Sequence, residues 1–253
     1  MAFTKRWLSW ELARRVGFEA VLIVGAYLAY QAVRQLIEGN AATAADRALD
    51  IIALERRLGL FREASLQAAI LDHHWLVSLF NWIYVWGYLP VISAAALWLF
   101  VFHRQRYSRY RNAFLLSGAC GLVFFALMPV APPRMFPHLG FVDTVRIHSS
   151  VYRTFDRSGF VNEFAALPSF HFGWILLVGL AVWAHGRWLP FRIAGAALPV
   201  LMLAAIVLTA NHYFLDAIVG GALVIAALGA VLWVERIDLP SRLRRASPVR
   251  VPR

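Results

Sequence analysis

Long apolar segments restrict this chain more than any other feature of its sequence. A helix needs roughly 20 mainly apolar residues to cross the hydrocarbon core of a bilayer. Segments of this kind occur near residues 18–37, 79–102, 112–130, 171–185, 189–208 and 213–234. Charged residues make up only 15% of the 253 residues, too few for the wetted surface of a soluble domain. We therefore predict an all-α polytopic membrane bundle of six transmembrane helices that forms a single domain, 1–253.

The positions of Lys and Arg predict the orientation of these helices. With both termini in the cytoplasm, 16 of the 25 Lys and Arg residues lie on the cytoplasmic side, although the loops on the other side are far longer. Membrane proteins show this bias. The net charge of +11 is therefore a topology signal and does not predict a nucleic-acid partner. We expect an integral cell-membrane protein with a cytoplasmic N-terminus, 1–17, a retained first span and a disordered basic tail, 238–253.

Two segments outside the spans are predicted to lie on the outer side. The first is the interfacial segment 38–78, in which apolar and charged residues, Glu55 among them, alternate over 44–72. This pattern predicts an amphipathic helix in the interface, which either caps the bundle or gates the substrate. The second segment, 131–170, is long and rich in Pro, Arg and aromatic residues. Because loops of this length in a compact fold are usually functional or disordered, we predict that it is the outer active-site loop.

Ionisable residues at the edges of the spans are candidates for function, because such groups are costly in lipid. His171 lies in ALPSFHFG at 166–173, where the fourth span begins, and His212 lies in TANHYFLDAIVGG at 209–221, where the sixth begins. Arg134 directly follows the outer end of the third span. Because successive spans alternate in direction, these three side chains are predicted to meet on the extracytoplasmic face of the membrane.

Asp216 follows His212 by four residues, which places the two side chains on one face of a helix. A hydrogen bond between the His212 ring and the carboxylate would fix the tautomer and leave the other ring nitrogen as a nucleophile. Phosphorus is the natural electrophile for such a histidine. His171 would protonate the leaving oxygen and then activate the incoming hydroxyl. We predict that these three residues are catalytic.

Neighbouring groups suit phosphate binding. Arg134 can bind phosphate in a bidentate manner. Ser169, Asn211 and the backbone N–H groups at the start of the fourth and sixth spans can hold phosphoryl oxygens, because helix N-termini favour anions.

The catalytic candidates also have other interpretations. His212 and Asp216 can be a buried ion pair that orients the helices, and His171 can be a structural residue. The three side chains together can be metal ligands, although their spacing matches no zinc-peptidase motif. We expect neither a metal nor a cofactor.

Two short motifs resemble the type 2 phosphatidic acid phosphatase superfamily. Residues 168–171, Pro-Ser-Phe-His, resemble the second motif of that family with Phe in place of Gly. Residues 212–216, His-Tyr-Phe-Leu-Asp, resemble the His and Asp end of the third motif. The resemblance implies that His212 is the nucleophile, Asp216 its partner and His171 the acid.

The sequence departs from the standard motifs at the phosphate-binding cations. The Arg of the third motif would fall at Ile206, and no Lys precedes Arg134 at the expected distance. Arg134 stands in for the Arg of the first motif. The pattern is closer to the branch with fungal and protozoan inositol phosphorylceramide and sphingolipid synthases and related bacterial proteins. The resemblance covers spans two to six, roughly 75–235. That branch implies six spans, a lumenal site, no metal and phosphotransfer from a lipid to an alcohol.

We therefore expect a membrane lipid phosphatase or phosphotransferase that cleaves a lipid phosphate ester through a phosphohistidine. The phosphoryl group would pass to an inositol-like alcohol or to water. Two other classes are considered: a transporter that uses the three catalytic candidates as a relay, and a noncatalytic scaffold that binds lipid headgroups. The polar residues cluster at one face, with no second polar layer across the membrane, which disfavours the transporter.

Overall fold

The computed structural model of the protein describes residues 2–37, 41–148 and 163–245. The chain divides into two compact units, Met1–Gly39 and Asn40–Arg253. The first unit is the helix α1 (Ala2–Ile37). Its segment Trp10–Val33 is long and apolar enough to cross a membrane. The second unit contains the other described helices and all of the predicted site residues.

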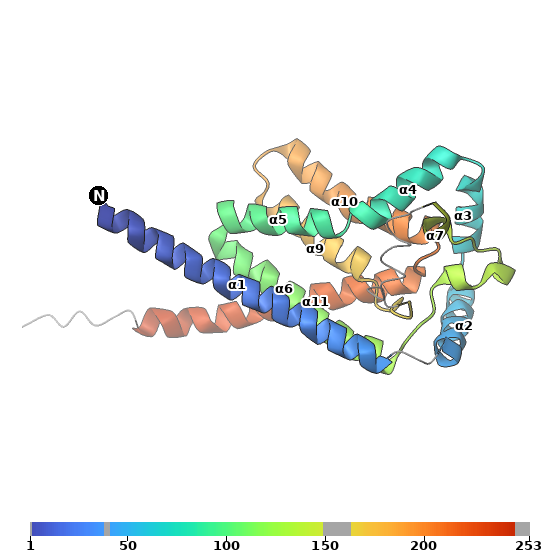
Figure 1. The fold of residues 1–253 in the computed structure, drawn as a ribbon, viewed down its shortest axis with the longest axis horizontal. Helices are drawn as coiled ribbons and strands as arrows, with labels where there is room; N and C mark the ends of the chain where they lie inside the picture. The colour runs from blue at the N-terminus through green and yellow to red at the C-terminus, as the bar shows by residue number, and fades with distance from the viewer. Residues whose placement is uncertain (1, 38–40, 149–162, 246–253) are drawn as a thin grey trace, which may run out of the picture. The chain divides into compact units, whose positions relative to one another are not determined.

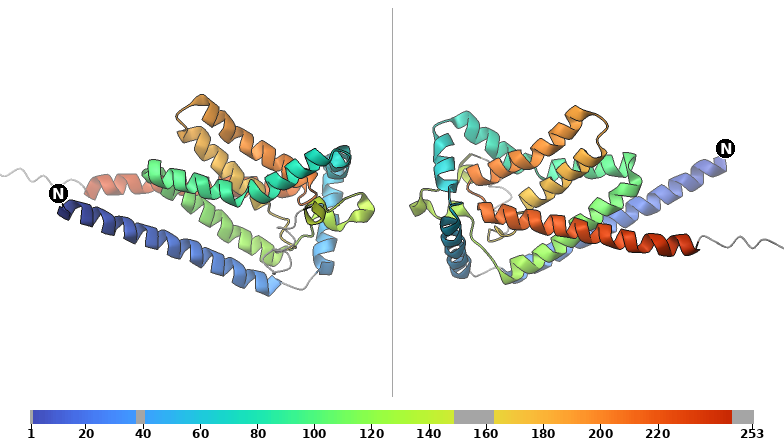
Figure 2. Two further views of the ribbon diagram at one scale, coloured as in Figure 1. Left: turned by 45° about the horizontal axis from the view of Figure 1, so that its top comes forward. Right: turned by 180° about the vertical axis from the view of Figure 1, so that it is seen from behind.

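The second unit is a bundle of helices with irregular connections at one end (Figures 1 and 2). Its α-helices are α2 (Ala41–Leu58), α3 (Glu63–Leu71), α4 (His74–Trp86), α5 (Leu89–Phe102), α6 (Arg104–Leu127), α7 (Thr144–His148), α9 (Phe170–His185), α10 (Leu189–Leu208) and α11 (Phe214–Arg245). Two short 3-10 helices, η1 (Pro133–Met135) and η2 (Pro137–Leu139), follow α6. The all-α prediction therefore holds for the described residues.

Four described helices are long and apolar enough to cross a membrane, or five if the bent pair α4 and α5 forms one span. These apolar helices make the chain an integral membrane protein. The prediction of six spans is not confirmed, because α9 has only 16 residues. The second predicted span, 79–102, is not one straight helix, since α4 and α5 meet at an angle of 47°. Pro90 lies in the first turn of α5 and cannot donate the hydrogen bond that would continue α4.

Glycines let α9 approach both of its neighbours closely. A Cβ on Gly173 would lie 2.7 Å from the carbonyl oxygen of Gly220 on α11. A Cβ on Gly179 would lie 2.7 Å from the carbonyl oxygen of Gly195 on α10. Small residues permit such backbone approaches between membrane helices. The start of α9, which carries His171, is therefore held directly against α11.

The helices α2 and α3 run across the end of the bundle at which α11 begins (Figures 1 and 2). Ala44, Ala48 and Ile52 are buried and form one core cluster with residues of the loops at that end. Leu49 and Leu54 remain exposed. The predicted helix is thus present and packs against the bundle end, while its place in a membrane interface stays a prediction. Glu55 belongs to the buried face and not to a solvated charged face.

The two remaining segments are described only in part. In the predicted active-site loop, residues 131–148 contain η1, η2 and α7, and residues 149–162 lie outside the described ranges. The predicted disordered tail begins as helix, because α11 continues to Arg245. The Arg and Pro residues of the tail indicate disorder, but the apolar helix before it continues past residue 238.

Candidate active site

Backbone hydrogen bonds join the connections at this end of the bundle. Val130, after α6, donates its N–H to the Phe164 carbonyl at 2.8 Å, and Ala166 donates to the Val130 carbonyl at 3.3 Å. Arg134 donates its N–H to the carbonyl of Ala210, after α10, at 2.8 Å. Segments more than 30 residues apart in sequence are thereby fixed against one another, and each carries a predicted site residue.

His212 is held by a backbone carbonyl as well as by Asp216. Its Nδ1 lies 2.9 Å from the Ala166 carbonyl oxygen, which can only accept, and 3.4 Å from Asp216 Oδ2. The Nδ1 therefore carries the proton, and the lone pair lies on Nε2, as a nucleophile requires. The prediction that His212 and Asp216 share a helix face needs correction, because α11 begins only at Phe214. The carbonyl of Ala166 was not predicted, because no side-chain pattern encodes a backbone acceptor.

A strained turn at Ala210 precedes His212 and fixes the direction of its side chain. Ala210 has φ 54°, a left-handed conformation that costs a residue with a Cβ about 1–2 kcal/mol. After this turn the N–H groups of Asn211 and His212 both donate to the Ile206 carbonyl, at 3.0 and 3.2 Å. The Ile206 side chain, at the position of the missing family Arg, is fully buried. Ile206 therefore contributes its side chain to the core and its carbonyl to the turn.

Asp216 is completely buried and connects three parts of the site. Its Oδ2 accepts the Tyr213 N–H at 2.9 Å, as the acidic residue of a capping box does at the start of a helix. Its backbone carbonyl accepts the Ser169 N–H at 2.9 Å. Asp216 thus fixes the beginning of α11, the beginning of α9 and the ring of His212 at once.

His171 faces His212 and lies among aromatic rings. The centroids of the two histidine rings are 5.5 Å apart. Tyr84 stacks on the His171 ring at 4.5 Å, and Tyr88 lies against it at 4.1 Å in a tilted arrangement. These contacts restrict the imidazole to the side from which it faces His212. Neither tyrosine was predicted, because their spacing of four residues in the first half of a predicted span is the only signal in the sequence.

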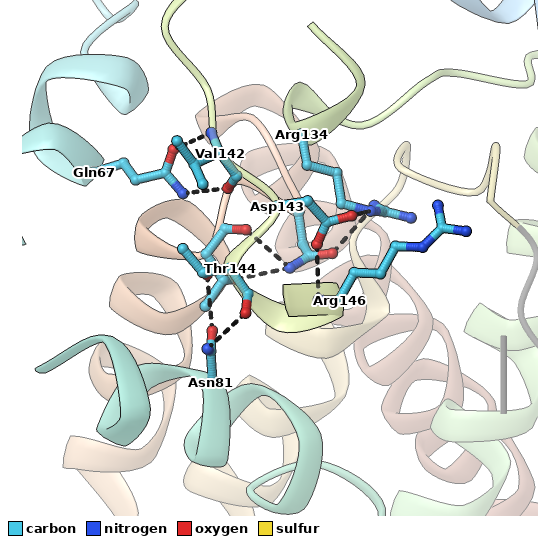
Figure 3. Close-up of polar contacts among 9 residues, drawn as sticks. Gln67, Asn81, Arg134, Val142, Asp143, Thr144 and Arg146 are labelled. Atoms are coloured by element: carbon cyan, nitrogen blue, oxygen red, sulfur yellow. Dashed lines mark hydrogen bonds and ion pairs between the residues drawn. The ribbon is translucent and has the colours of Figure 1, made fainter. Parts of the chain in front are cut away.

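Arg134 reaches the site through polar contacts that Figure 3 shows. Its Nη1 donates to Asn211 Oδ1 at 3.1 Å, and its Nε lies 3.3 Å from Asp143 Oδ2. Asp143 also accepts the Arg146 N–H at 2.9 Å through its other oxygen, at the start of α7. The Asn211 amide donates to the Thr209 carbonyl at 3.1 Å and hydroxyl at 2.8 Å. Asn211 is thus engaged by protein groups, and its visible role is to orient Arg134.

Side chains from α3 and α4 hold the loop that carries Asp143 (Figure 3). Gln67 accepts the Val142 N–H at 2.9 Å and donates to the Val142 carbonyl at 2.8 Å. The Asn81 amide donates to the Thr144 carbonyl at 3.0 Å, and the Thr144 hydroxyl donates to Asn81 Oδ1 at 2.9 Å. The polar amides are buried and satisfied, so this loop is fixed on both sides of Asp143.

The helix starts differ from their predicted role as open phosphate sites. At α9 the Ser169 Oγ accepts the Phe172 N–H at 3.4 Å, so this predicted phosphate ligand is an N-cap. At α11 the Phe214 and Leu215 N–H groups donate to Glu63 and Glu55, at 3.1 and 2.7 Å. Three carboxylates therefore occupy the first turn of α11, and the prediction that its N–H groups bind phosphate is wrong. Glu63 is 151 residues from Phe214 in sequence, and Glu55 is 160 residues from Leu215.

No group of three or more His, Cys, Asp or Glu side chains in the described part of the chain is arranged to hold a metal ion. The interpretation of the catalytic candidates as metal ligands thus finds no support in their geometry. Their arrangement instead suits an imidazole nucleophile with a fixed tautomer, a second imidazole facing it and a guanidinium beside them.

Comparison with known proteins identifies one family. The sequence model described as the PAP2 superfamily matches residues 49–230, which contain every catalytic and phosphate-binding candidate. No curated protein and no solved structure matches the chain.

Proposed function

The chain belongs to the PAP2 superfamily, which points to an enzyme of the lipid phosphatase type, and we propose that it acts through a phosphohistidine on His212. The observation that carries this proposal is the 2.9 Å contact between His212 Nδ1 and the Ala166 carbonyl. This contact leaves the lone pair on Nε2. The ring of His171 faces the His212 ring, with the two centroids 5.5 Å apart. A nucleophile and a general acid therefore face each other across the space in which phosphorus would bind.

The proposed reaction has two steps. In the first, His212 Nε2 attacks phosphorus, a P–N bond forms, and the P–O bond to the leaving group breaks while His171 protonates the departing oxygen. In the second, the hydroxyl of water or of an alcohol attacks phosphorus, its proton passes to His171, and the P–N bond breaks. Asp216, 3.4 Å from Nδ1, stabilises positive charge on the His212 ring. Arg134 would bind the phosphoryl oxygens.

Phosphatase and transferase share these residues and differ in the acceptor. The inositol phosphorylceramide synthase-like motif, Asn-His-Tyr-x-x-Asp, supports transfer to an alcohol acceptor over hydrolysis. The distribution of Lys and Arg supports a site on the extracytoplasmic face and two cytoplasmic termini. The substrate would be a lipid phosphate within the membrane.

The experiment compares wild type with His212→Ala in detergent, with EDTA present and a panel of lipid phosphates with and without inositol-like alcohols. His138→Ala is the matched control, because His138 is an exposed histidine in the loop that also carries Arg134. We expect turnover in wild type and control, none in His212→Ala, and acid-labile phosphate on wild type quenched in base. The ratio of free phosphate to exchanged product separates hydrolysis from transfer. Equal turnover in wild type and His212→Ala would refute the mechanism, and no turnover in either would favour the transporter or scaffold.

A further inference from the structure

A buried pair of glutamates lies behind the proposed nucleophile, and the reaction as written does not use it. Glu55 on α2 and Glu63 on α3 are both fully buried. Glu63 Oε1 accepts the Phe214 N–H at 3.1 Å, and Glu55 Oε1 accepts the Leu215 N–H at 2.7 Å. These N–H groups belong to the residues two and three positions after His212.

The first turn of α11 is therefore capped from another part of the chain. The first N–H groups of a helix have no partner within the helix and need one when buried. Asp216 satisfies Tyr213 from within α11, while the two glutamates satisfy the next two residues from α2 and α3. The backbone from Tyr213 to Asp216 is thus fixed relative to helices that lie across the bundle end.

From this geometry we infer that Glu55 and Glu63 are positioning residues that hold the start of α11 so that His212 faces phosphorus. The inference rests on the proposed function of His212. It assigns α2 and α3 a role in catalysis beyond covering the bundle end: they fix the segment that links the nucleophile to Asp216. Neither glutamate touches the reacting atoms.

The pair must hold a proton to be stable in this place. Burial, followed by the neighbouring Glu63 carboxyl, raises the pKa of Glu55 from 4.5 to about 9. The titratable groups facing Glu55 are Glu63 from α3 and Asp216 and Tyr213 from the start of α11. Glu55 Oε2 is buried and receives no hydrogen bond from the described groups, and a proton shared with the neighbouring Glu63 carboxyl would satisfy it. A glutamine at this position would keep both the acceptor and a donor.

The experiment measures kcat and KM for Glu55→Ala and Glu55→Gln, with Asp50→Ala as the matched control because Asp50 is an exposed acid on the same helix. We expect Glu55→Ala to lower kcat roughly 30-fold or more with KM nearly unchanged, because a displaced nucleophile loses rate more than affinity. Glu55→Gln should stay within about threefold of wild type near neutral pH, since it preserves the hydrogen bond. Normal kcat in Glu55→Ala, or equal loss in both variants, would overturn the inference.

Two further measurements do not depend on turnover. The folded-state pKa of Glu55 lies above its ordinary value of 4.5, so wild-type stability falls as pH rises from that value to about 9. The melting temperature of Glu55→Gln relative to wild type should therefore rise over that range, and a constant difference would contradict the buried proton.

Amide exchange of the peptide around residues 213–216 should be faster in Glu55→Ala than in Glu55→Gln. If wild type shows no turnover, the proposed function fails, and this exchange comparison alone decides whether the glutamates hold α11. Unchanged exchange in Glu55→Ala would overturn the inference even in an active enzyme.

Discussion

Replacing Gly220 by alanine tests whether contact between α9 and α11 sets the geometry of the site. A Cβ on Gly220 would overlap the Ser169 carbonyl oxygen and lie 2.9 Å from its carbon and 3.1 Å from its nitrogen. These are backbone atoms, so no flexible side chain can move aside. The Ser169 N–H also donates to the Asp216 carbonyl at 2.9 Å. A methyl group at this point must therefore separate the two helices that carry His171 and Asp216.

The matched control is Gly229→Ala on the same helix, where a Cβ would have no neighbour within 4 Å. Alanine is better than glycine in a helix by about 1 kcal/mol, so this control should be slightly stabilised. Gly220→Ala gains the same propensity but pays an overpacking cost of about 1–3 kcal/mol. The two variants should therefore differ by roughly 1–3 kcal/mol. For a chain of this size that is a gap of roughly 2–12 °C in melting temperature.

The assay is a thermal unfolding scan in detergent together with turnover of a lipid phosphate. A displacement of about 1 Å at Ser169 would carry His171 with it and can cost on the order of 100-fold in rate. We therefore expect Gly220→Ala to lose most activity even below its melting temperature, while Gly229→Ala stays active. Wild-type turnover and melting temperature in Gly220→Ala would refute the reasoning, because the helices would then have room that the structure denies them.

Two other predictions concern His212 and the orientation of the protein. Asp216→Asn keeps an oxygen for the Tyr213 N–H but removes the charge 3.4 Å from His212 Nδ1. The kcat should therefore fall roughly 1,000-fold while the melting temperature changes little. A kcat near that of wild type would contradict a charge-stabilising role. In a Cys120→Ser background, a membrane-impermeant maleimide should label His138→Cys in intact cells, whereas Arg187→Cys should react only after lysis. The reverse pattern would place the site on the cytoplasmic face.

The sequence was most informative where local chemistry decides the outcome. Long apolar runs predicted helices α6, α10 and α11, because lipid demands about 20 apolar residues whatever the tertiary context. Both ends agree for α10, whereas α6 begins at Arg104 and not near 112, and α11 continues to Arg245 and not to 234. The same rule failed at 79–102, where Gly87 and Pro90 break the run into two helices. The run at 171–185 matches α9, which has only 16 residues, but the rule does not decide whether so short a helix crosses the membrane. Short apolar runs fit a span and a buried core helix alike.

The sequence predicted the residues of the candidate site but not the contacts that hold them. The sequence indicates His171, His212 and Asp216 because ionisable groups at the edge of a span are costly, and the structure brings all three together. Arg134 and Asn211 were also brought into contact, at 3.1 Å. Their catalytic and binding roles stay predictions. What the sequence missed is the framework around them.

That framework depends on contacts between residues far apart in the chain. Glu55 looked like part of a solvated helix face, yet it is buried against a backbone N–H 160 residues away. A periodic pattern shows which face of a helix is apolar, but it cannot name the partner of a carboxylate. Backbone acceptors such as the Ala166 carbonyl leave no mark in the sequence, because every residue has one.

The sequence by itself determined that this is a helical membrane protein and which side chains are costly enough to require a function. Both follow from properties of single residues and of the lipid around them. Only the tertiary structure decided the tautomer of His212, the aromatic surroundings of His171 and the capping of α11 by glutamates. Each of these depends on the distance between atoms on separate segments, which is fixed when the helices pack and not before.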